Sequence, residues 1–514
     1  MSLVAEKTFK KGTYFSKLSI GVIGGGASAT SFLRSLLMCL KRGALPPLLN
    51  ITIFESKDKF GSGFPYEEDF SCLRLNRTEE AMSVCNNDTK HFSKWVKEKQ
   101  NHYPCLKDDK FISRNIFGRY LRETFWQTIY ELEELGASIN TYHARVIDVT
   151  KKDEGYILKT NDGNQSFFDF TLLCTGAIRP DDPYKLDDAR HYIQCPYPAA
   201  VNLSRIPKTD SVAILGTSLT AIDMAISLKY KGHTGPIFMI SRTGQLPTIK
   251  GMQKQYTPFY FTDKNINLHK KKNGFVSLRH LYRLLRKEFK IINLNLINTL
   301  FEKNPPIVDE DAIKIELENS QKPNKWFDIL EATHPILDRA WIHVPEAHKQ
   351  IFIRKYMSKF LYKRASIPTI NAKIIHEMMS NQQLKIHGGI KDIQNSSDSY
   401  LINLKDQKSI YTRWIINATG PSRNLRNNRL INNLISSGNA VESSNGGIKV
   451  VPKNGAVIDT KGNIDYSLRA IGHAACGEYL FINNLETISK ITSKVANEVS
   501  EIVNNQIQIR PQGG

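Results

Sequence analysis

The sequence predicts an α/β fold made of two parallel-sheet units with an inserted, mainly helical segment. A glycine-rich turn occurs twice, at residues 24–29 and 216–221, each time between a short apolar segment and an apolar helical pattern. The apolar segments, residues 19–23 and 212–215, are typical of buried parallel strands. Residues 255–385 lack such turns and are charged with a helical pattern. These observations predict two Rossmann-like units and a helical insertion.

Each glycine-rich turn has the chemistry of a phosphate site. Glycine lets the backbone turn tightly and approach a pyrophosphate, while the helix N-terminus presents unpaired N–H groups to the anion. One such turn alone is as easily a tight connection, but two in this order predict two dinucleotide cofactors. The candidate ligands are Gly24, Gly26, Ser28 and Ala29 in the first turn, and Gly216, Thr217, Ser218 and Thr220 in the second. Ser218 departs from the ideal pattern, because its Cβ occupies the place where a glycine admits the pyrophosphate.

The residue that ends the second strand of each unit distinguishes the two cofactors. Residues 50–55 form an apolar segment that ends in Glu55, whose carboxylate can accept hydrogen bonds from both hydroxyls of an unphosphorylated ribose. Glu55 lies well beyond the roughly twenty residues that separate the two features in a minimal NAD unit. This longer spacing favours FAD at the first turn.

The second unit ends instead in Ser241 and Arg242, which suit the 2′-phosphate of NADPH. A charge-assisted hydrogen bond contributes about 1.5–3 kcal/mol, so one Arg can favour NADPH over NADH by about tenfold to a hundredfold. The alternative is that Arg242 is a solvated loop cation.

Two further apolar segments, residues 171–176 and 413–420, stop at a Thr-Gly pair. Such strands would return the chain to a sheet, and the glycine would allow close passage beside a cofactor or crossover. Taken alone, each is as well explained as an ordinary junction between a strand and a turn.

The order of motifs resembles that of FAD/NAD(P)-binding flavoproteins related to the class B flavin monooxygenases and the N-hydroxylating monooxygenases. The resemblance covers most of the chain and is closest to a bacterial branch named only for its two cofactors. It depends on the first turn with Glu55, the second turn, and residues 61–66, 75–77, 81–83, 114–121, 241–247, 364–368, 417–421 and 470–473.

The resemblance implies that NADPH reduces the flavin, that the flavin reacts with oxygen, and that the resulting flavin (hydro)peroxide oxygenates a small molecule. It places Asn76 and Arg77 beside the flavin ring as the candidate catalytic residues, with no acid-base residue required. The other FAD contacts that it implies are Val146, Thr175, Gly176, Gly472 and Asn484, or Asn483 in place of Asn484. The alternative role for Asn76 and Asn484 is an Asx turn or helix cap.

The type of oxygenation stays open. The Baeyer–Villiger pattern is absent between the two glycine turns, where residues 191–197 are the nearest stretch and lack its glycine and tryptophan. N-hydroxylation of an amine or small amino acid and Baeyer–Villiger chemistry both remain, in either case with a role in secondary metabolism. The alternative function is a non-catalytic, flavin-bound sensor or assembly protein that docks through a basic helix at residues 278–290.

Composition indicates a cytoplasmic enzyme. The chain is 41% hydrophobic over 514 residues, has no apolar run long enough to span a bilayer, and opens with a polar, basic stretch unlike a signal peptide. Its seven cysteines include no Cys-x-x-Cys pair, which argues for reduced thiols and against the disulfide reductases. No metal-ligand spacing occurs. The net charge of +20 comes without a nucleic-acid-binding motif, so no nucleic-acid partner is expected. The resemblance implies a small-molecule substrate and oxygen as partners, and the oligomeric state is undetermined.

The order of motifs divides the chain into six segments. We expect the helical insertion to provide substrate selectivity and a lid, with Trp341, His343, Tyr362 and Arg364 as candidates for the wall of the site. The alternative is that an aromatic residue at helical spacing belongs to the core. The segments are an N-terminal tail (1–17), the first part of the FAD domain (18–200), the NADPH unit (201–254), the helical insertion (255–385), a return to the NADPH and FAD domains with a C-terminal helix from 485 (386–509), and a tail (510–514).

Overall fold

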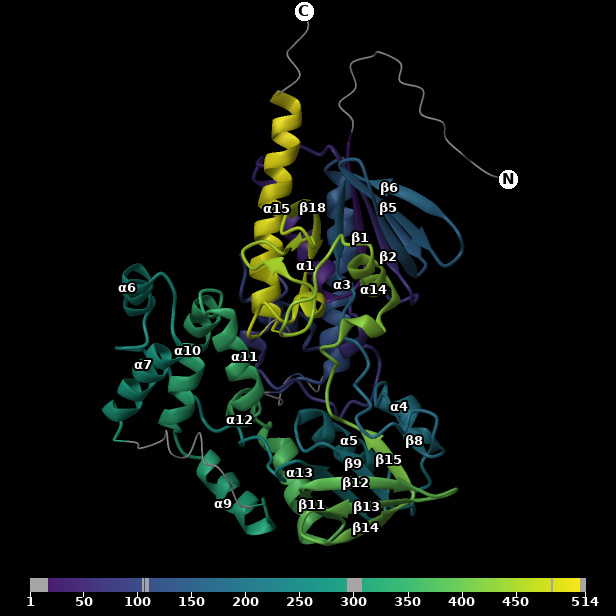
Figure 1. Cartoon of the computed structure of the whole chain (residues 1–514), viewed down its shortest axis with the longest axis vertical. Helices are drawn as coiled ribbons and strands as arrows, with labels where there is room; N and C mark the ends of the chain where they lie inside the picture. The colour runs from purple at the N-terminus through teal and green to yellow at the C-terminus, as the bar shows by residue number, and fades with distance from the viewer. Residues whose placement is uncertain (1–16, 104–105, 107–110, 294–306, 482–483, 509–514) are drawn as a thin grey trace, which may run out of the picture.

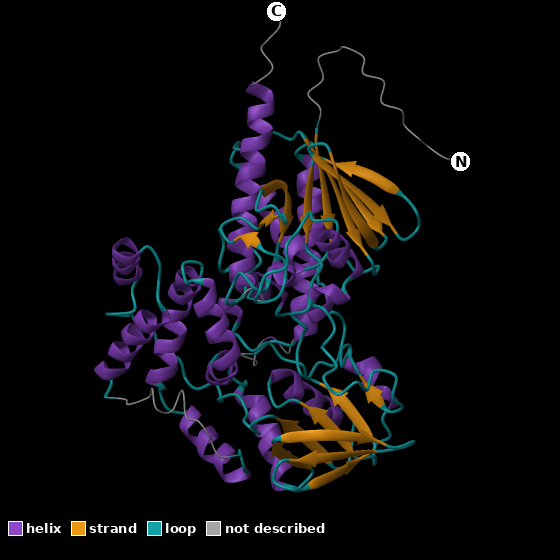
Figure 2. Ribbon diagram, in the orientation of Figure 1, coloured by secondary structure: helices purple, strands orange, loops and turns teal. Residues whose placement is uncertain are grey.

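The computed structural model describes residues 17–103, 106, 111–293, 307–481 and 484–508. One sheet with the helices α1 (Ala27–Lys41) and α15 (Leu485–Gln508) lies at one end of the molecule, a second sheet lies at the other end, and a helical lobe lies to one side (Figure 1). The strands are confined to the two sheet regions, and the side lobe is helical (Figure 2). The predicted α/β fold with two sheet units and a helical insertion is confirmed.

The first sheet has a parallel centre of five strands in the order β3-β2-β1-β7-β18, with β17 and β16 added antiparallel at one edge. Its central strands are apolar because both faces are covered, as is usual for parallel sheets. Helices α1, α3 (Arg114–Glu134) and α15 pack together on one face, and a three-stranded meander lies on the other. The strands are β1 (Leu18–Ile23), β2 (Leu49–Glu55), β3 (Ser138–His143), β7 (Phe170–Leu173), β16 (Val450–Val451), β17 (Ala456–Ile458) and β18 (Ile464–Ala470), and the meander is β4 (Val146–Lys152), β5 (Gly155–Thr160) and β6 (Gln165–Phe168).

The second sheet repeats this plan. Its order is β11-β10-β9-β15-β8, and all its strand pairs are parallel. Again a helix follows the central strand, and a three-stranded meander precedes the strand that returns beside it. The elements are β8 (Tyr192–Ile193), β9 (Val212–Leu215), α5 (Leu219–Tyr230), β10 (Ile237–Ser241), α13 (Thr369–Ser380), β11 (Leu384–Gly388), β12 (Ile390–Asn395), β13 (Tyr400–Leu404), β14 (Ser409–Thr412) and β15 (Trp414–Asn417). The chain thus completes the second sheet before it returns to the first at β16.

The two glycine-rich turns are fixed by the same close contact. Gly24 has φ +102°, and a Cβ on it would lie 2.2 Å from the carbonyl oxygen of Cys174. Gly216 has φ +132°, and its Cβ would lie 2.7 Å from the carbonyl oxygen of Ala418. The expected close passage at the Thr-Gly pairs therefore occurs one residue before each Thr. The glycines that follow each Thr, Gly176 and Gly420, have no protein atom within 4 Å of a Cβ position. Their positive φ, not a close contact, is what favours glycine there.

The helical lobe is inserted between β10 and β11 of the second sheet. Its amphipathic helix α7 (Leu278–Ile291) corresponds to the predicted basic helix, with Leu281, Leu284 and Phe289 buried and its cations exposed. The other helices are α6 (Asp263–Asn273), α9 (Glu310–Ser320), α10 (Lys325–Trp341), α11 (Glu346–Lys355) and α12 (Met357–Arg364).

A buried polar network joins the two sheet units. Arg114, the first residue of α3, forms an ion pair with Asp223 of α5 over 2.6 Å between Nη2 and Oδ2. Tyr197, in the segment that links the units, donates its hydroxyl hydrogen to Asp223 (2.6 Å) and accepts one from Arg114 (3.0 Å). The Asp223 side chain is 4% exposed, so the pair is shielded from water.

We expect Gly24→Ala to disrupt folding and flavin content, because its methyl group would overlap the Cys174 carbonyl. Gly163→Ala is the matched control, since Gly163 has φ +90° with no atom within 4 Å of a Cβ and would incur only backbone strain of about 1–3 kcal/mol. The thermal unfolding midpoint and the flavin absorbance of the purified proteins measure the difference. Equal midpoints for the two variants would contradict the role of the close contact.

Candidate functional site

The N-terminus of α1 at the first glycine-rich turn has backbone N–H groups free to bind an anion. No side chain caps α1, and the first helical hydrogen bond runs from Thr30 N–H to the Gly26 carbonyl (3.0 Å). The N–H groups of the first turn, which include those of Ser28 and Ala29, therefore have no partner within the helix. A Cβ on Gly26 would lie 3.0 Å from the Cα of Gly63, so the loop at residues 61–66 packs directly against the turn. This backbone fits a pyrophosphate, which needs N–H donors and close approach.

The other residues predicted for FAD lie at different depths around this turn. Glu55 ends β2, and its carboxylate accepts from the Gly25 N–H (2.9 Å), so it lies at the mouth of the turn. Gly472 follows β18, and a Cβ there would lie 3.2 Å from the Ser28 hydroxyl. Thr175 and Gly176 directly follow the carbonyl that contacts Gly24. Val146 begins β4 with its side chain buried in the core.

The second turn uses two of its predicted ligands internally. The Thr217 hydroxyl donates its one hydrogen to the Gln245 carbonyl (2.5 Å) and accepts from the Ser241 hydroxyl (3.0 Å), which itself accepts from the Gly244 N–H (2.9 Å). These contacts tie the loop after β10 to the turn. Sequence alone did not show that the two hydroxyls point inward.

The remaining residues predicted for NADPH lie at the surface of the second turn. Ser218 is the N-cap of α5, makes no side-chain capping bond and is exposed, and Thr220 lies in the first helical turn. Arg242 is exposed directly after β10. The backbone N–H groups and this guanidinium are the features suited to a phosphorylated dinucleotide.

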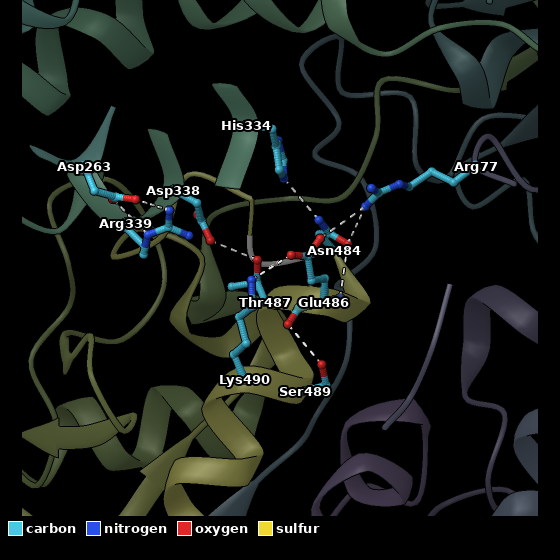
Figure 3. Close-up of polar contacts among 10 residues, drawn as sticks. All are labelled: Arg77, Asp263, His334, Asp338, Arg339, Asn484, Glu486, Thr487, Ser489 and Lys490. Atoms are coloured by element: carbon cyan, nitrogen blue, oxygen red, sulfur yellow. Dashed lines mark hydrogen bonds and ion pairs between the residues drawn. The ribbon is translucent and has the colours of Figure 1, made fainter. Parts of the chain in front are cut away.

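The two predicted ring-side residues Arg77 and Asn484 lie in contact, although 407 positions separate them. Arg77 donates to the Asn484 side-chain oxygen (3.0 Å), and the Asn484 amide donates to Nε2 of His334 on α10 (3.1 Å) (Figure 3). Burial, with the charges of Arg364 and Arg77, lowers the pKa of His334 to about 2. His334 is therefore neutral, accepts at Nε2 and carries its proton on Nδ1. Asn483 lies outside the described residues.

The start of α15 is held by the helical lobe through a second set of contacts. Thr487 donates to the carboxylate of Asp338 on α10 (3.0 Å), and burial raises the pKa of Asp338. Glu486 accepts from Lys490 (2.6 Å) and lies 3.9 Å from Arg77 (Figure 3). The junction of the first unit and the helical lobe is therefore a network of directed polar contacts.

Two more cations reach the same junction. Lys250, which follows β10, is 7% exposed and donates to the carbonyl of Asn76 over 3.5 Å. Burial lowers its pKa to about 8. Arg364, at the end of α12, lies over the Phe481 ring with its Cζ 4.2 Å from the centroid and is 3.8 Å from Glu331.

Sequence reasoning found only part of this junction. Arg364 was among the candidates for the wall of the site, whereas Lys250, His334 and Glu331 were missed. His334 and Glu331 lie in a charged helical segment and Lys250 in a loop, and in neither place does a local pattern mark a buried polar side chain. Trp341 has the alternative role of a core residue, because it is 1% exposed and packs in the core of the helical lobe. Two others contact lysines of that lobe instead: His343 contacts Lys270 (3.2 Å), and the Tyr362 ring contacts Lys363.

In the described part of the chain, no group of three or more His, Cys, Asp or Glu side chains is placed to hold a metal ion. None of the described helices has the length and apolar character to cross a membrane. Six of the seven cysteines lie among the described residues, and all six are free.

Comparison with known proteins finds a family match in the first unit. A family model described as FAD-NAD(P)-binding matches residues 21–178. The uncharacterized protein YdhS of Escherichia coli strain K12 is 25% identical over 308 residues, which are 53% of this chain. The match spans 54% of YdhS, about half the length of that relative.

Solved structures share the whole architecture. The ornithine N-hydroxylase of Kutzneria sp. 744, solved with reduced FAD, NADP⁺ and L-ornithine, has a TM-score of 0.57 at 10% identity and covers 95% of this chain and 99% of its own. The L-lysine 6-monooxygenase of Pseudomonas syringae has a TM-score of 0.57 at 11% identity, over 95% of this chain and 99% of its own. The cadaverine monooxygenase DfoA of Erwinia amylovora has a TM-score of 0.55 at 12% identity, over 96% of this chain and 95% of its own. The chain therefore has the fold of two-dinucleotide flavoproteins, as the motif order predicts.

We expect Asn484→Ala to weaken the junction, because it removes the acceptor of Arg77 and the donor to His334 together. The loss of one charge-assisted and one neutral hydrogen bond, both partly buried, should reduce the free energy of unfolding by about 1–3 kcal/mol. Denaturant unfolding of the flavin-bound protein, followed by flavin fluorescence, measures it. Asn267→Ala, on an exposed position of α6, is the control and should change little. Identical curves for both variants would show that Asn484 does not secure the junction.

Proposed function

We propose that the chain is an NADPH-dependent flavin monooxygenase that oxygenates a small molecule. The observation that carries the proposal is the presence of two complete dinucleotide units, each with an uncapped helix N-terminus beside a glycine-rich turn. The polar junction of Arg77, Asn484 and His334 lies between the first unit and the helical lobe. The shared fold with ornithine, lysine and cadaverine monooxygenases supports the choice of reaction.

In this proposal the first turn holds FAD. The N–H groups of Ser28 and Ala29 bind the pyrophosphate, Gly24 and Gly26 let it approach, and Glu55 binds the ribose. Asn76, Arg77 and Asn484 lie beside the ring. FAD, when bound, supplies the transfer of electrons from NADPH to oxygen. The chain itself binds and orients both cofactors, and its buried junction keeps water from the reacting atoms.

The second turn would hold NADPH. Its backbone N–H groups bind the pyrophosphate, and Arg242 binds the 2′-phosphate. The hydroxyls of Thr217 and Ser241 act differently from the expectation: they fix the loop at residues 241–245 against the turn, and this loop continues to Lys250 at the junction. NADPH bound at the turn would therefore contact a loop that extends to the substrate region.

A non-catalytic, flavin-bound role is the second candidate function. It is supported by the exposed face of α7, which carries Arg279, Arg283, Arg286, Lys287 and Lys290. Such a face suits docking on an acidic partner. The two functions differ in whether NADPH reduces the bound flavin.

The monooxygenase proposal predicts that anaerobic NADPH bleaches the flavin absorbance of the purified protein. Admission of oxygen should then give a transient absorbance before the oxidised spectrum returns, because the buried site delays release of reduced oxygen species. Stopped-flow spectroscopy measures both steps. A flavin that NADPH does not reduce would reject the enzyme proposal and favour the docking role of α7.

The cofactor proposal predicts that Arg242→Ala weakens NADPH binding about tenfold to a hundredfold, the effect of one charge-assisted hydrogen bond. NADH binding should be nearly unchanged, since NADH lacks the phosphate. The dependence of the flavin reduction rate on each nucleotide measures both affinities. Arg279→Ala, on the exposed face of α7, is the control for general loss of positive charge. An equal effect on NADPH and NADH would remove Arg242 from the 2′-phosphate site.

A further inference from the structure

Three cations from three parts of the chain gather at the junction. Arg77 comes from the segment between β2 and α3 of the first unit, Lys250 from the loop after β10, and Arg364 from the end of α12. Each of the two arginines has only a long contact with a carboxylate: Arg364 lies 3.8 Å from Glu331, and Arg77 lies 3.9 Å from Glu486. Glu486 is already paired with Lys490 at 2.6 Å. Asp338 also acts on Arg364, so three carboxylates (Glu331, Glu486 and Asp338) face four cations (Arg77, Lys250, Arg364 and Lys490). Positive charge is therefore in excess by one in this part of the described structure.

Lys250 is the least compensated of the three. Its ammonium group makes one long hydrogen bond, to the Asn76 carbonyl (3.5 Å), and lies 5.5 Å from the centroid of the Phe111 ring. Among the described residues no carboxylate lies within ion-pair distance of it. Burial and the charges of Arg77 and Arg364 lower its pKa to about 8, against the opposing charge of Glu331. A buried cation without an anion is costly, so such groups are normally paired.

The backbone holds Lys250 firmly in this unfavourable position. Its N–H donates to the Ile367 carbonyl (2.8 Å), and its own carbonyl accepts from the Thr369 hydroxyl (3.0 Å). Ile249 and Ile367 form a parallel bridge beside it. The side chain is therefore presented at the junction by a rigid segment, and no packing requirement explains why it is charged.

The surroundings of Lys250 offer further donors. Arg364 and the neutral ring of His334 both stack against Phe481, with 4.2 Å to its centroid in each case. His334 is 5% exposed, and its Nδ1, which carries the proton, has no hydrogen-bond partner. The junction thus combines cations and an unused N–H donor around an apolar ring.

We propose that Arg77, Lys250 and Arg364 form a receptor for the carboxylate of a small acidic substrate. This inference rests on the proposed function, because it identifies the substrate class of the same site. An ammonium with three donors and a guanidinium fork match the lone pairs of a carboxylate. The phosphates of the two cofactors have their own sites at the two glycine-rich turns. A diamine such as cadaverine would add positive charge to the cluster and is disfavoured.

The test uses the flavin-bound protein and the variants Lys250→Met and Lys250→Arg. The probes are acetate, succinate, inorganic phosphate and cadaverine, and the measurements are the flavin difference spectrum and the shift of the thermal unfolding midpoint. Lys254→Met, an exposed lysine four residues away, is the matched control. Lys250→Met removes an uncompensated buried charge, so its own unfolding midpoint should be equal to or above that of the wild type.

We expect succinate or acetate to bind saturably to the wild type and to Lys254→Met, and about 10- to 100-fold more weakly to Lys250→Met. Lys250→Arg should restore most of the affinity, and cadaverine should not bind. NADPH affinity should be the same in all four proteins.

Several outcomes would overturn the proposal. Carboxylates without effect on the wild type, or equal binding to Lys250→Met, would show that there is no such receptor. Weaker NADPH binding in Lys250→Met, with phosphate competing against NADPH, would assign the cations to the cofactor. The proposed function fails separately: if NADPH does not reduce the flavin but carboxylates still bind through Lys250, the anion site stands and the oxygenation does not.

Discussion

The buried ion pair between Arg114 and Asp223 is the constraint on which the arrangement of the two cofactor turns depends. Arg114 begins α3, which packs against α1, and α1 begins at the first glycine-rich turn. Asp223 lies on α5, which begins at the second turn. Burial disfavours the charge of Arg114, but the nearby Asp223 and Tyr197 outweigh it and raise the pKa of the guanidinium. The guanidinium therefore stays charged. Burial raises the pKa of Asp223, while Arg114 and the Tyr197 hydroxyl favour its ionised form. Removal of either partner would leave the other buried at a cost of about 3–5 kcal/mol.

The repeated topology explains how three distant parts of the chain reach one junction. In the first unit the connection from β2 to β3 contains α3, which packs on α1. In the second unit the connection from β10 to β11 ends in α13, which packs on α5 in the same way. The helical lobe is an enlargement of this second connection. It leaves the sheet at the carboxyl end of β10, beside the second glycine-rich turn, and the chain then re-enters the sheet at β11, the edge strand. That placement brings His334 and Arg364 to the junction.

Local rules predicted the parts of the site that depend on backbone geometry. The glycines at 24 and 216, and the residues Glu55 and Arg242, follow from the spacing of strand, turn and helix, and the structure places all four at the two turns. The resemblance placed Arg77 and Asn484 beside the flavin ring, but their mutual contact was not predicted, since no local pattern connects the two. The direction of a hydroxyl or a buried lysine depends on its tertiary neighbours. For that reason Thr217 was taken as a cofactor ligand and Lys250 was not noticed.

The positive charges of the chain differ in effect according to whether they are exposed or buried. The cations on the exposed face of α7 are solvated, and each contributes little to stability or recognition by itself. Lys250 and Arg364 carry the same charge in a buried place, where water no longer compensates it and the described carboxylates do so only at long distance. The net charge of +20 therefore says less about function than the buried location of Lys250 and Arg364 does. In the proposed receptor, the buried cations and the neutral histidine beside them would favour an acidic ligand over an uncharged polar one.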